Sequence, residues 1–341
     1  MEYLRELFHE FLNSEGEIDI DGYHFERYDI LQSMEGEGYK EAFDRWLEGR
    51  KLEMLNKAND ILKRFGNVDR FRRLQEIYRR GTMVPFVGAG LSMSSGYPGW
   101  TEFLYKIRQE TRLTESVLNS LIANGHYEEA AQQLFDDMPN GAFLELLENS
   151  FGCIRELVGP VQRLPYLFSQ SVITTNFDNV LERCYDEVGK SFSEVLLGIY
   201  AQELPRRLGE GKHVLVKLHG KADSSRERIL TKQEYDRYYQ DDNVLEQVIE
   251  AICGQPLLFL GCSLTVDRTL KAMENIMLRK GINNVPRHYA FLGLKDTDNQ
   301  VARKYQLSQS NIFPIWYPNE WDHDECIEAL LTKLQEGADQ K

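Results

Sequence analysis

Hydrophobic residues recur at two different spacings along the chain, and the change of spacing divides it in two. In residues 1–80 the apolar positions fall three or four apart, as at Leu4, Leu7 and Phe8, which gives a helix one apolar face. A polar, glycine-containing break at 13–16 ends the first of these helices. The pattern predicts a helical region in 1–80 that serves packing, oligomerisation or partner docking.

From residue 81 onward, short apolar runs alternate with helical patterns. Each run has four or five residues, too few for a helix, and is almost continuously apolar, as expected for buried parallel strands. Alternating strands and helices imply right-handed crossovers. The sequence therefore predicts an α/β fold: a Rossmann-like, doubly wound parallel sheet of about six strands in residues 81–341, with an N-terminal helical extension and a helical insertion near 221–255. The predicted strands are 83–87, 172–175, 214–218, 257–260, 289–292 and 312–316.

Composition and charge exclude several classes of protein. Hydrophobic residues make up 42% of the 341 positions and charged residues 28%, which is typical of globular proteins. The net charge of −14 argues against direct nucleic-acid binding, because a phosphate backbone calls for a basic surface. The most apolar run, at 256–262, is too short to cross a bilayer, and the N-terminus lacks a secretion signal. We expect a cytoplasmic protein without membrane association.

The five cysteines do not form a metal-binding pattern. They are Cys153, Cys184, Cys253, Cys262 and Cys326, and no two of them make a Cys-x-x-Cys pair. Neither a zinc ribbon nor a disulfide framework is indicated, so we expect no bound metal and reduced thiols.

The first predicted strand ends in a glycine loop, Gly88-Ala89-Gly90, followed two residues later by Ser92. Glycines let backbone N–H groups approach an anion closely, which suits a phosphate. The dehydrogenase fingerprint requires a third glycine where this chain has Met93, and the Gly-Lys-Ser/Thr of a P-loop is absent. By itself the loop indicates either a dinucleotide cradle of another kind or an ordinary turn.

Three more predicted strands end in polar or small residues. Asn176 and Asp178 follow the second strand and can face one crevice, although Asp178 could equally cap the next helix. His219 ends the third strand, where it is either a general base or a structural histidine. Gly261 and Ser263 form a small-residue turn after the fourth strand that suits phosphate or ribose. Ligands of doubly wound sheets bind at the carboxyl ends of the strands, so these residues are the candidate site.

Taken in order, the four motifs GAG-x-S, TTNFD, KLHG and GCSL resemble the NAD-binding core of the sirtuins. The likeness covers about residues 83–316 and is greatest to the divergent sirtuin-like proteins of bacterial antiphage defence. The resemblance implies that Asn176 positions an attacking water beside the nicotinamide ribose and that Asp178 holds the nicotinamide carboxamide. It also implies that His219 acts as base through the ribose hydroxyls. The remaining residues would contact the pyrophosphate and ribose: Gly88, Ala89, Gly90, Ser92, Gly261 and Ser263.

The chain departs from the lysine-deacylating sirtuins in one respect. Those enzymes carry a zinc module with two Cys-x-x-Cys pairs between the histidine and Gly-x-Ser motifs, whereas Cys253 is the only cysteine between His219 and Gly261 here. Without four thiolates that structural zinc cannot bind. The zinc module helps to shape the groove that binds the acyl-peptide. Because this chain lacks the module, water is the natural acceptor. The resemblance then implies an NAD⁺ glycohydrolase that releases nicotinamide and ADP-ribose, linear or cyclised.

Two alternatives stay open at this point: an NAD-dependent protein deacylase and a non-catalytic nucleotide sensor or scaffold subunit. The sensor has no need of a base such as His219. An active NAD⁺ hydrolase is lethal to its own cell, so the resemblance implies a gated, NAD-depleting effector of abortive infection. It further implies a homo-oligomer, a regulatory partner, or both; that partner would be a HerA-like ATPase or a nucleotide-binding protein similar to inosine-triphosphate pyrophosphatase.

Overall fold

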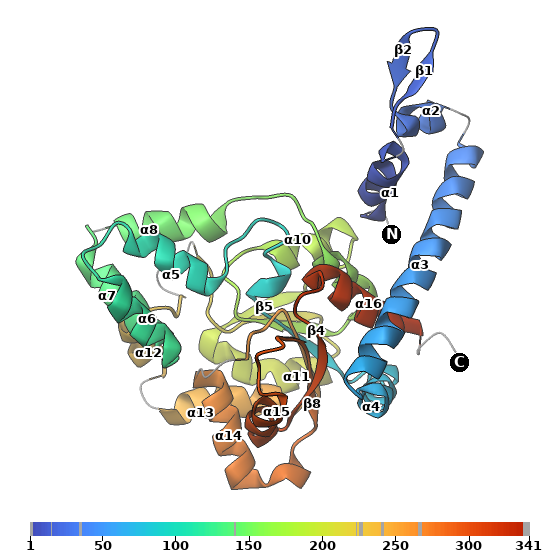
Figure 1. Ribbon diagram of the computed structural model, residues 1–341. Helices are drawn as coiled ribbons and strands as arrows, with labels where there is room; N and C mark the ends of the chain where they lie inside the picture. The colour runs from blue at the N-terminus through green and yellow to red at the C-terminus, as the bar shows by residue number, and fades with distance from the viewer. Residues whose placement is uncertain are drawn as a thin grey trace. The chain divides into compact units, whose positions relative to one another are not determined.

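The computed structural model describes residues 3–14, 16–33, 36–139, 141–222, 224, 228–239, 242–264 and 268–336 (Figure 1). The chain divides into two compact units, Met1–Asp60 and Ile61–Lys341. The boundary between the units, at residue 60, lies earlier in the chain than the boundary at residue 80 that the change of hydrophobic spacing predicted. The reason is that Ile61, Phe71 and Leu74 are buried in the core of the second unit.

The first unit contains helices and one short hairpin. Leu4, Phe8 and Phe43 form its small core. The hairpin was not predicted: its strands have only three residues each, and they are joined by Asp21-Gly22, both with positive φ (53° and 84°). An Asp-Gly pair is a strong signal for a tight hairpin turn. The elements are α1 (Leu4–Asn13), β1 (Ile18–Ile20), β2 (Tyr23–Phe25), α2 (Arg27–Ser33) and α3 (Glu37–Arg64), which continues into the second unit.

The second unit is built on a seven-stranded parallel sheet, ordered β5-β6-β4-β3-β7-β8-β9. This confirms the Rossmann-like doubly wound fold and the six predicted strands. The prediction missed β5, an edge strand whose sequence begins with Glu194 and is only partly buried, so its apolar run is incomplete. The strands are β3 (Val84–Val87), β4 (Ser171–Thr174), β5 (Glu194–Leu197), β6 (Val214–Lys217), β7 (Leu257–Leu260), β8 (His288–Leu294) and β9 (Ile312–Pro318).

Helices cover both faces of this sheet. Alternate strand residues enter separate hydrophobic clusters: Phe86 and Phe259 pack on one face, Val87 and Leu260 on the other. Burial on both sides explains why the strands are almost continuously apolar. The helices of this unit, besides the end of α3, are α4 (Val68–Arg79), α5 (Trp100–Arg108), α6 (Glu115–Ala123), α7 (Tyr127–Asp137), α8 (Ala142–Leu147), α9 (Leu164–Leu167), α10 (Val180–Glu187), α11 (Leu204–Gly209), α12 (Lys232–Tyr239), α13 (Asp242–Cys253), α14 (Arg268–Lys280), α15 (Gln300–Gln309) and α16 (His323–Glu336).

The order of the strands places the candidate site. β3 lies in the middle of the sheet; β4, β6 and β5 extend it on one side, and β7, β8 and β9 on the other. The chain changes sides between β6 and β7, through the α12–α13 segment that occupies the predicted insertion. In doubly wound sheets a ligand crevice opens at such a switch point, outside the carboxyl ends of the strands. Within the described residues, no helix is long and apolar enough to cross a membrane.

Candidate active site

A cleft of about 1060 Å³ lies at the carboxyl ends of the strands around β3. Its lining comes from β-strand ends together with α5, α7, α12 and the start of α14. Nine residues were singled out in the sequence, and eight of them line this one cleft: Gly88, Ala89, Gly90, Asn176, Asp178, His219, Gly261 and Ser263. The ninth, Ser92, is buried behind the lining and is only 2% exposed.

Two glycine loops cross in the floor of the cleft. The Gly90 N–H donates to the Gly261 carbonyl oxygen at 2.9 Å. A Cβ on Gly88 would lie 2.6 Å from that same oxygen, and one on Gly261, where φ is +65°, would lie 2.6 Å from the Leu91 nitrogen. Only glycine permits this crossing. The glycines at the ends of β3 and β7 therefore bring the two loops together, which the loop sequence alone did not reveal.

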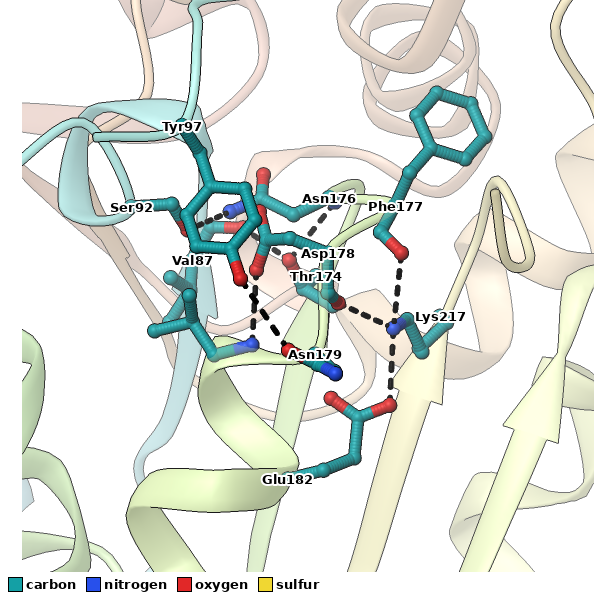
Figure 2. Close-up of polar contacts among 11 residues, drawn as sticks. Val87, Ser92, Tyr97, Thr174, Asn176, Phe177, Asp178, Asn179, Glu182 and Lys217 are labelled. Carbon is teal, nitrogen blue, oxygen red and sulfur yellow. Dashed lines mark hydrogen bonds and ion pairs between the residues drawn. The ribbon is translucent and has the colours of Figure 1, made fainter. Parts of the chain in front are cut away.

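Two hydroxyl groups hold Asn176, one at its backbone and one at its side chain. Its backbone N–H donates to Thr174 Oγ1 at 3.0 Å, and its side-chain Nδ2 donates to Ser92 Oγ at 3.1 Å (Figure 2). The residue is 7% exposed. Because the amide nitrogen is engaged behind the lining, the amide oxygen is the group left to accept a hydrogen bond from the cleft. Ser92 thus orients Asn176 from behind.

Asp178 accepts a backbone N–H at the start of α10 and also lines the cleft. Its Oδ1 accepts the N–H of Val180, the first residue of α10, at 3.1 Å. Asp178 therefore holds the helix start as the capping alternative expected, although the N-cap position itself is Asn179. The side chain is 5% exposed. Burial raises the pKa of this carboxyl, and the nearby Lys217 ammonium opposes that rise. The two readings of Asp178 are therefore compatible.

Lys217 is a residue of the site that sequence reasoning missed. It ends β6, is 1% exposed, and its Nζ donates to the Asp178 carbonyl oxygen at 2.6 Å and to Glu182 Oε1 at 2.9 Å (Figure 2). It holds the loop that carries Asn176 and Asp178 against the neighbouring strand. The available signal was a charged residue at the last position of an otherwise apolar strand.

His219 is partly buried in the wall of the cleft. Its Nε2 lies 2.9 Å from the hydroxyl of Tyr235 on α12, and the ring also forms a hydrogen bond with the Thr175 backbone. Burial lowers the pKa of His219 to about 4. The imidazole is therefore neutral at pH 7 and able to accept a proton. Tyr235, like Lys217, was not singled out in the sequence.

No group of three or more His, Cys, Asp or Glu side chains is arranged to hold a metal ion among the residues that the structure describes. The five cysteines are free thiols, three of them buried. The polar side chains that line the cleft include amide, carboxyl, imidazole, phenol, hydroxyl and guanidinium groups.

Residues 170–315 match the family model described as SIR2-like domain. The chain is 25% identical over 252 residues to the NAD(+) hydrolase ThsA of Enterococcus faecium, covering 71% of this chain and 51% of that protein. It is 27% identical to ThsA of Bacillus cereus (67% and 47% covered) and 26% identical to defense-associated sirtuin 2 of Bacillus subtilis (80% and 27%). The chain spans about half the length of these two ThsA proteins.

Proposed function

We propose that this divergent sirtuin-like protein is an NAD⁺ glycohydrolase, which cleaves NAD⁺ to nicotinamide and ADP-ribose as a gated, NAD-depleting effector of antiphage defence. The observation that carries the proposal is the meeting of Asn176 and His219 in one cleft floored by two crossing glycine loops. The similarity to proteins named NAD(+) hydrolase supports the same substrate.

Hydrolysis breaks the bond between the nicotinamide nitrogen and the ribose anomeric carbon. That carbon gains positive charge as nicotinamide leaves, and a water molecule then supplies the new C–O bond and releases one proton. In the proposed arrangement the Asn176 amide oxygen accepts a hydrogen bond from this water, because its amide nitrogen is held by Ser92. An acceptor fixed before the reaction stabilises the transition state without reorganising.

His219 is the proposed base. A neutral imidazole accepts the proton of a ribose hydroxyl, and the extra electron density on the sugar stabilises the cationic carbon. Asp178 holds the nicotinamide carboxamide from the end of the neighbouring strand, β4. Gly88, Ala89 and Gly90, with Gly261 and Ser263, lie against the pyrophosphate and ribose. The N–H groups of Gly88 and Gly90 already donate to the carbonyl oxygens of Leu260 and Gly261, so these two glycines contribute close approach of the backbone rather than a donor.

The test is product analysis. The purified chain, alone and together with each candidate activator, is incubated with NAD⁺, and the products are separated by chromatography. We expect nicotinamide in equal amounts with linear or cyclic ADP-ribose. Nicotinamide release that requires an acylated lysine peptide would identify a deacylase, and tight NAD⁺ binding without any product would identify a nucleotide sensor. Either result would contradict the proposal.

Gating belongs to the same proposal. The predicted division gives residues 1–80 to self-association or partner docking and residues 81–341 to the catalytic domain. Because Ile61, Phe71 and Leu74 are buried in the core of the second unit, the docking role falls to residues 1–60. The regulator is a second copy of the chain or a separately encoded HerA-like ATPase or inosine-triphosphate-pyrophosphatase-like protein. The protein acts on cytoplasmic NAD⁺. Size-exclusion chromatography with light scattering of the full chain, and of the chain without residues 1–60, measures whether this region controls assembly.

A further inference from the structure

The segment between the histidine motif and the Gly-x-Ser motif places a phenol on the proposed base. Tyr235 lies on α12, and its hydroxyl is 2.9 Å from His219 Nε2, with the two rings edge to face at 73° and 6.0 Å between centroids. Both residues line the cleft. A ligand that reaches His219 therefore also meets Tyr235.

The start of α12 is fixed by a capping box. The Glu234 N–H donates to Thr231 Oγ1 at 3.3 Å, and Glu234 Oε2 accepts the Thr231 N–H at 2.9 Å. In this motif each of the two residues satisfies the backbone N–H of the other. Glu234 also forms a buried ion pair with Arg228, through Nε at 3.1 Å. Tyr235, the next residue, is thus attached to a rigid helix start.

Two further contacts hold α12 and the Tyr235 ring against the helices beside the cleft. The Gln233 N–H donates to Gln132 on α7 at 3.0 Å. The Arg268 guanidinium lies 5.0 Å from the centroid of the Tyr235 ring, and its Nε is 2.5 Å from Glu128 Oε1. A cation over an aromatic face adds attraction to the packing. These contacts fix the position of Tyr235 in the wall of the cleft.

We propose that Tyr235 is a further residue of the reaction, which orients the His219 imidazole and passes to it the proton of the ribose hydroxyl. This inference rests on the proposed function. Tyr235 Oη donates its hydrogen to His219 Nε2 and accepts the hydrogen of the ribose hydroxyl. In the step, one O–H bond breaks on the ribose and one forms on Tyr235, while the original Tyr235 O–H breaks and an N–H forms on His219. No oxidant or other reactant is needed.

The chemistry of a neutral imidazole agrees with this direction of transfer. Such a ring has one N–H and one lone pair. The backbone of Thr175 interacts with the ring, and the Tyr235 hydroxyl lies at Nε2. A phenol is both donor and acceptor, so it can stand between the lone pair and a sugar hydroxyl. In this proposal the role of α12, between the histidine motif and the Gly-x-Ser motif, is to supply the Tyr235 hydroxyl to His219.

The test compares Tyr235→Phe with Tyr238→Phe, a matched change on the same helix at a residue that packs against the hydrophobic core. Phenylalanine keeps the ring and removes only the hydroxyl. In steady-state NAD⁺ hydrolysis we expect Tyr235→Phe to lower kcat at least tenfold with little change in KM, and Tyr238→Phe to leave both unchanged. An unchanged rate would overturn the proposal, and so would a raised rate, because it would show that the hydroxyl obstructs His219.

A second measurement does not depend on turnover. NMR titration of the His219 imidazole nitrogens in the full chain reports its protonation. Because a donor to the lone pair stabilises the neutral ring, we expect the pKa of His219 to rise in Tyr235→Phe and to stay in place in Tyr238→Phe. If wild type releases no nicotinamide under any condition, the hydrolase proposal fails, and this titration alone decides whether Tyr235 governs the base. An unchanged His219 titration would overturn the inference even in an active enzyme.

Discussion

The ammonium group of Lys217 donates a hydrogen bond to the backbone carbonyl oxygen of Asp178 at 2.6 Å. The two residues come from the ends of neighbouring parallel strands, since β4 pairs with β6. The contact therefore ties the loop that carries Asn176 and Asp178 to the strand that ends in Lys217 and leads to His219. The geometry of the proposed reaction depends on this tie between two strand ends.

Replacing Lys217 with methionine is expected to destabilise the fold. The change removes the partner of a partly buried Glu182 carboxylate and of the Asp178 carbonyl, and breaking a buried ion pair typically costs about 3–5 kcal/mol. Urea unfolding measures the loss. Lys304→Met, on an exposed lysine, is the matched control and should lie within about 0.5 kcal/mol of wild type. A Lys217→Met protein as stable as this control would contradict the role of the tie.

The double change Lys217→Met with Glu182→Leu separates charge from packing. Removing both charges together leaves no unpaired ion, so the double variant should be more stable than Lys217→Met alone. If the two losses simply add, the ion pair is not the origin of the effect.

Alanine at Gly261 is expected to open the floor of the cleft. Its Cβ would lie 2.6 Å from the Leu91 nitrogen at a residue with φ of +65°, so the loop must move away from the Gly88–Gly90 turn. We expect NAD⁺ affinity, measured by calorimetry, to fall at least tenfold. Gly209→Ala, where nothing lies within 4 Å of the added atom, should bind like wild type. Unchanged affinity in Gly261→Ala would show that the crossing loops do not form the NAD⁺ site.

Much of this architecture was predictable because its signals are local. Six strands are short apolar runs buried on both faces, and the site residues follow four of them directly, so the carboxyl-end rule places them together. β5 was not predicted because this edge strand, which begins with Glu194, is only partly buried and therefore lacks a continuous apolar run. The roles of Lys217 and Tyr235 were not predicted because they depend on contacts across 39 and 16 positions of the chain. The charge at the end of an apolar strand marked Lys217 as unusual but did not identify its partners.

Acid is expected to destabilise the native state through a buried histidine. His288 is fully buried, and its Nδ1 accepts the Leu257 N–H at 3.2 Å; burial lowers its pKa to about 3. Unfolded histidine titrates near 6.5. Below that pH His288 is protonated in the unfolded chain but stays neutral in the native state. The contribution of His288 to the free energy of unfolding is therefore fully present above pH 6.5 and falls by about 1.4 kcal/mol per unit as pH drops toward 3. His219, whose pKa is lowered to about 4, adds a similar loss over a narrower range.

Urea unfolding between pH 7.5 and 5 measures this slope, and two variants assign it. In His288→Asn the amide oxygen still accepts the Leu257 N–H but does not titrate, so the slope should be shallower. His126→Asn, at an exposed position, should keep the wild-type slope. Equal slopes in wild type and His288→Asn would rule out His288 as the source.

Nicotinamide release by the activated full chain tests the central claim most directly, in wild type, Asn176→Ala, His219→Ala and the exposed control Asn124→Ala. The two cleft variants should still bind NAD⁺ because the glycine loops are intact. We predict that removing the base lowers kcat by about 10²–10⁴-fold, that Asn176→Ala lowers it at least tenfold, and that Asn124→Ala retains full activity. Full turnover by either Asn176→Ala or His219→Ala would contradict the account.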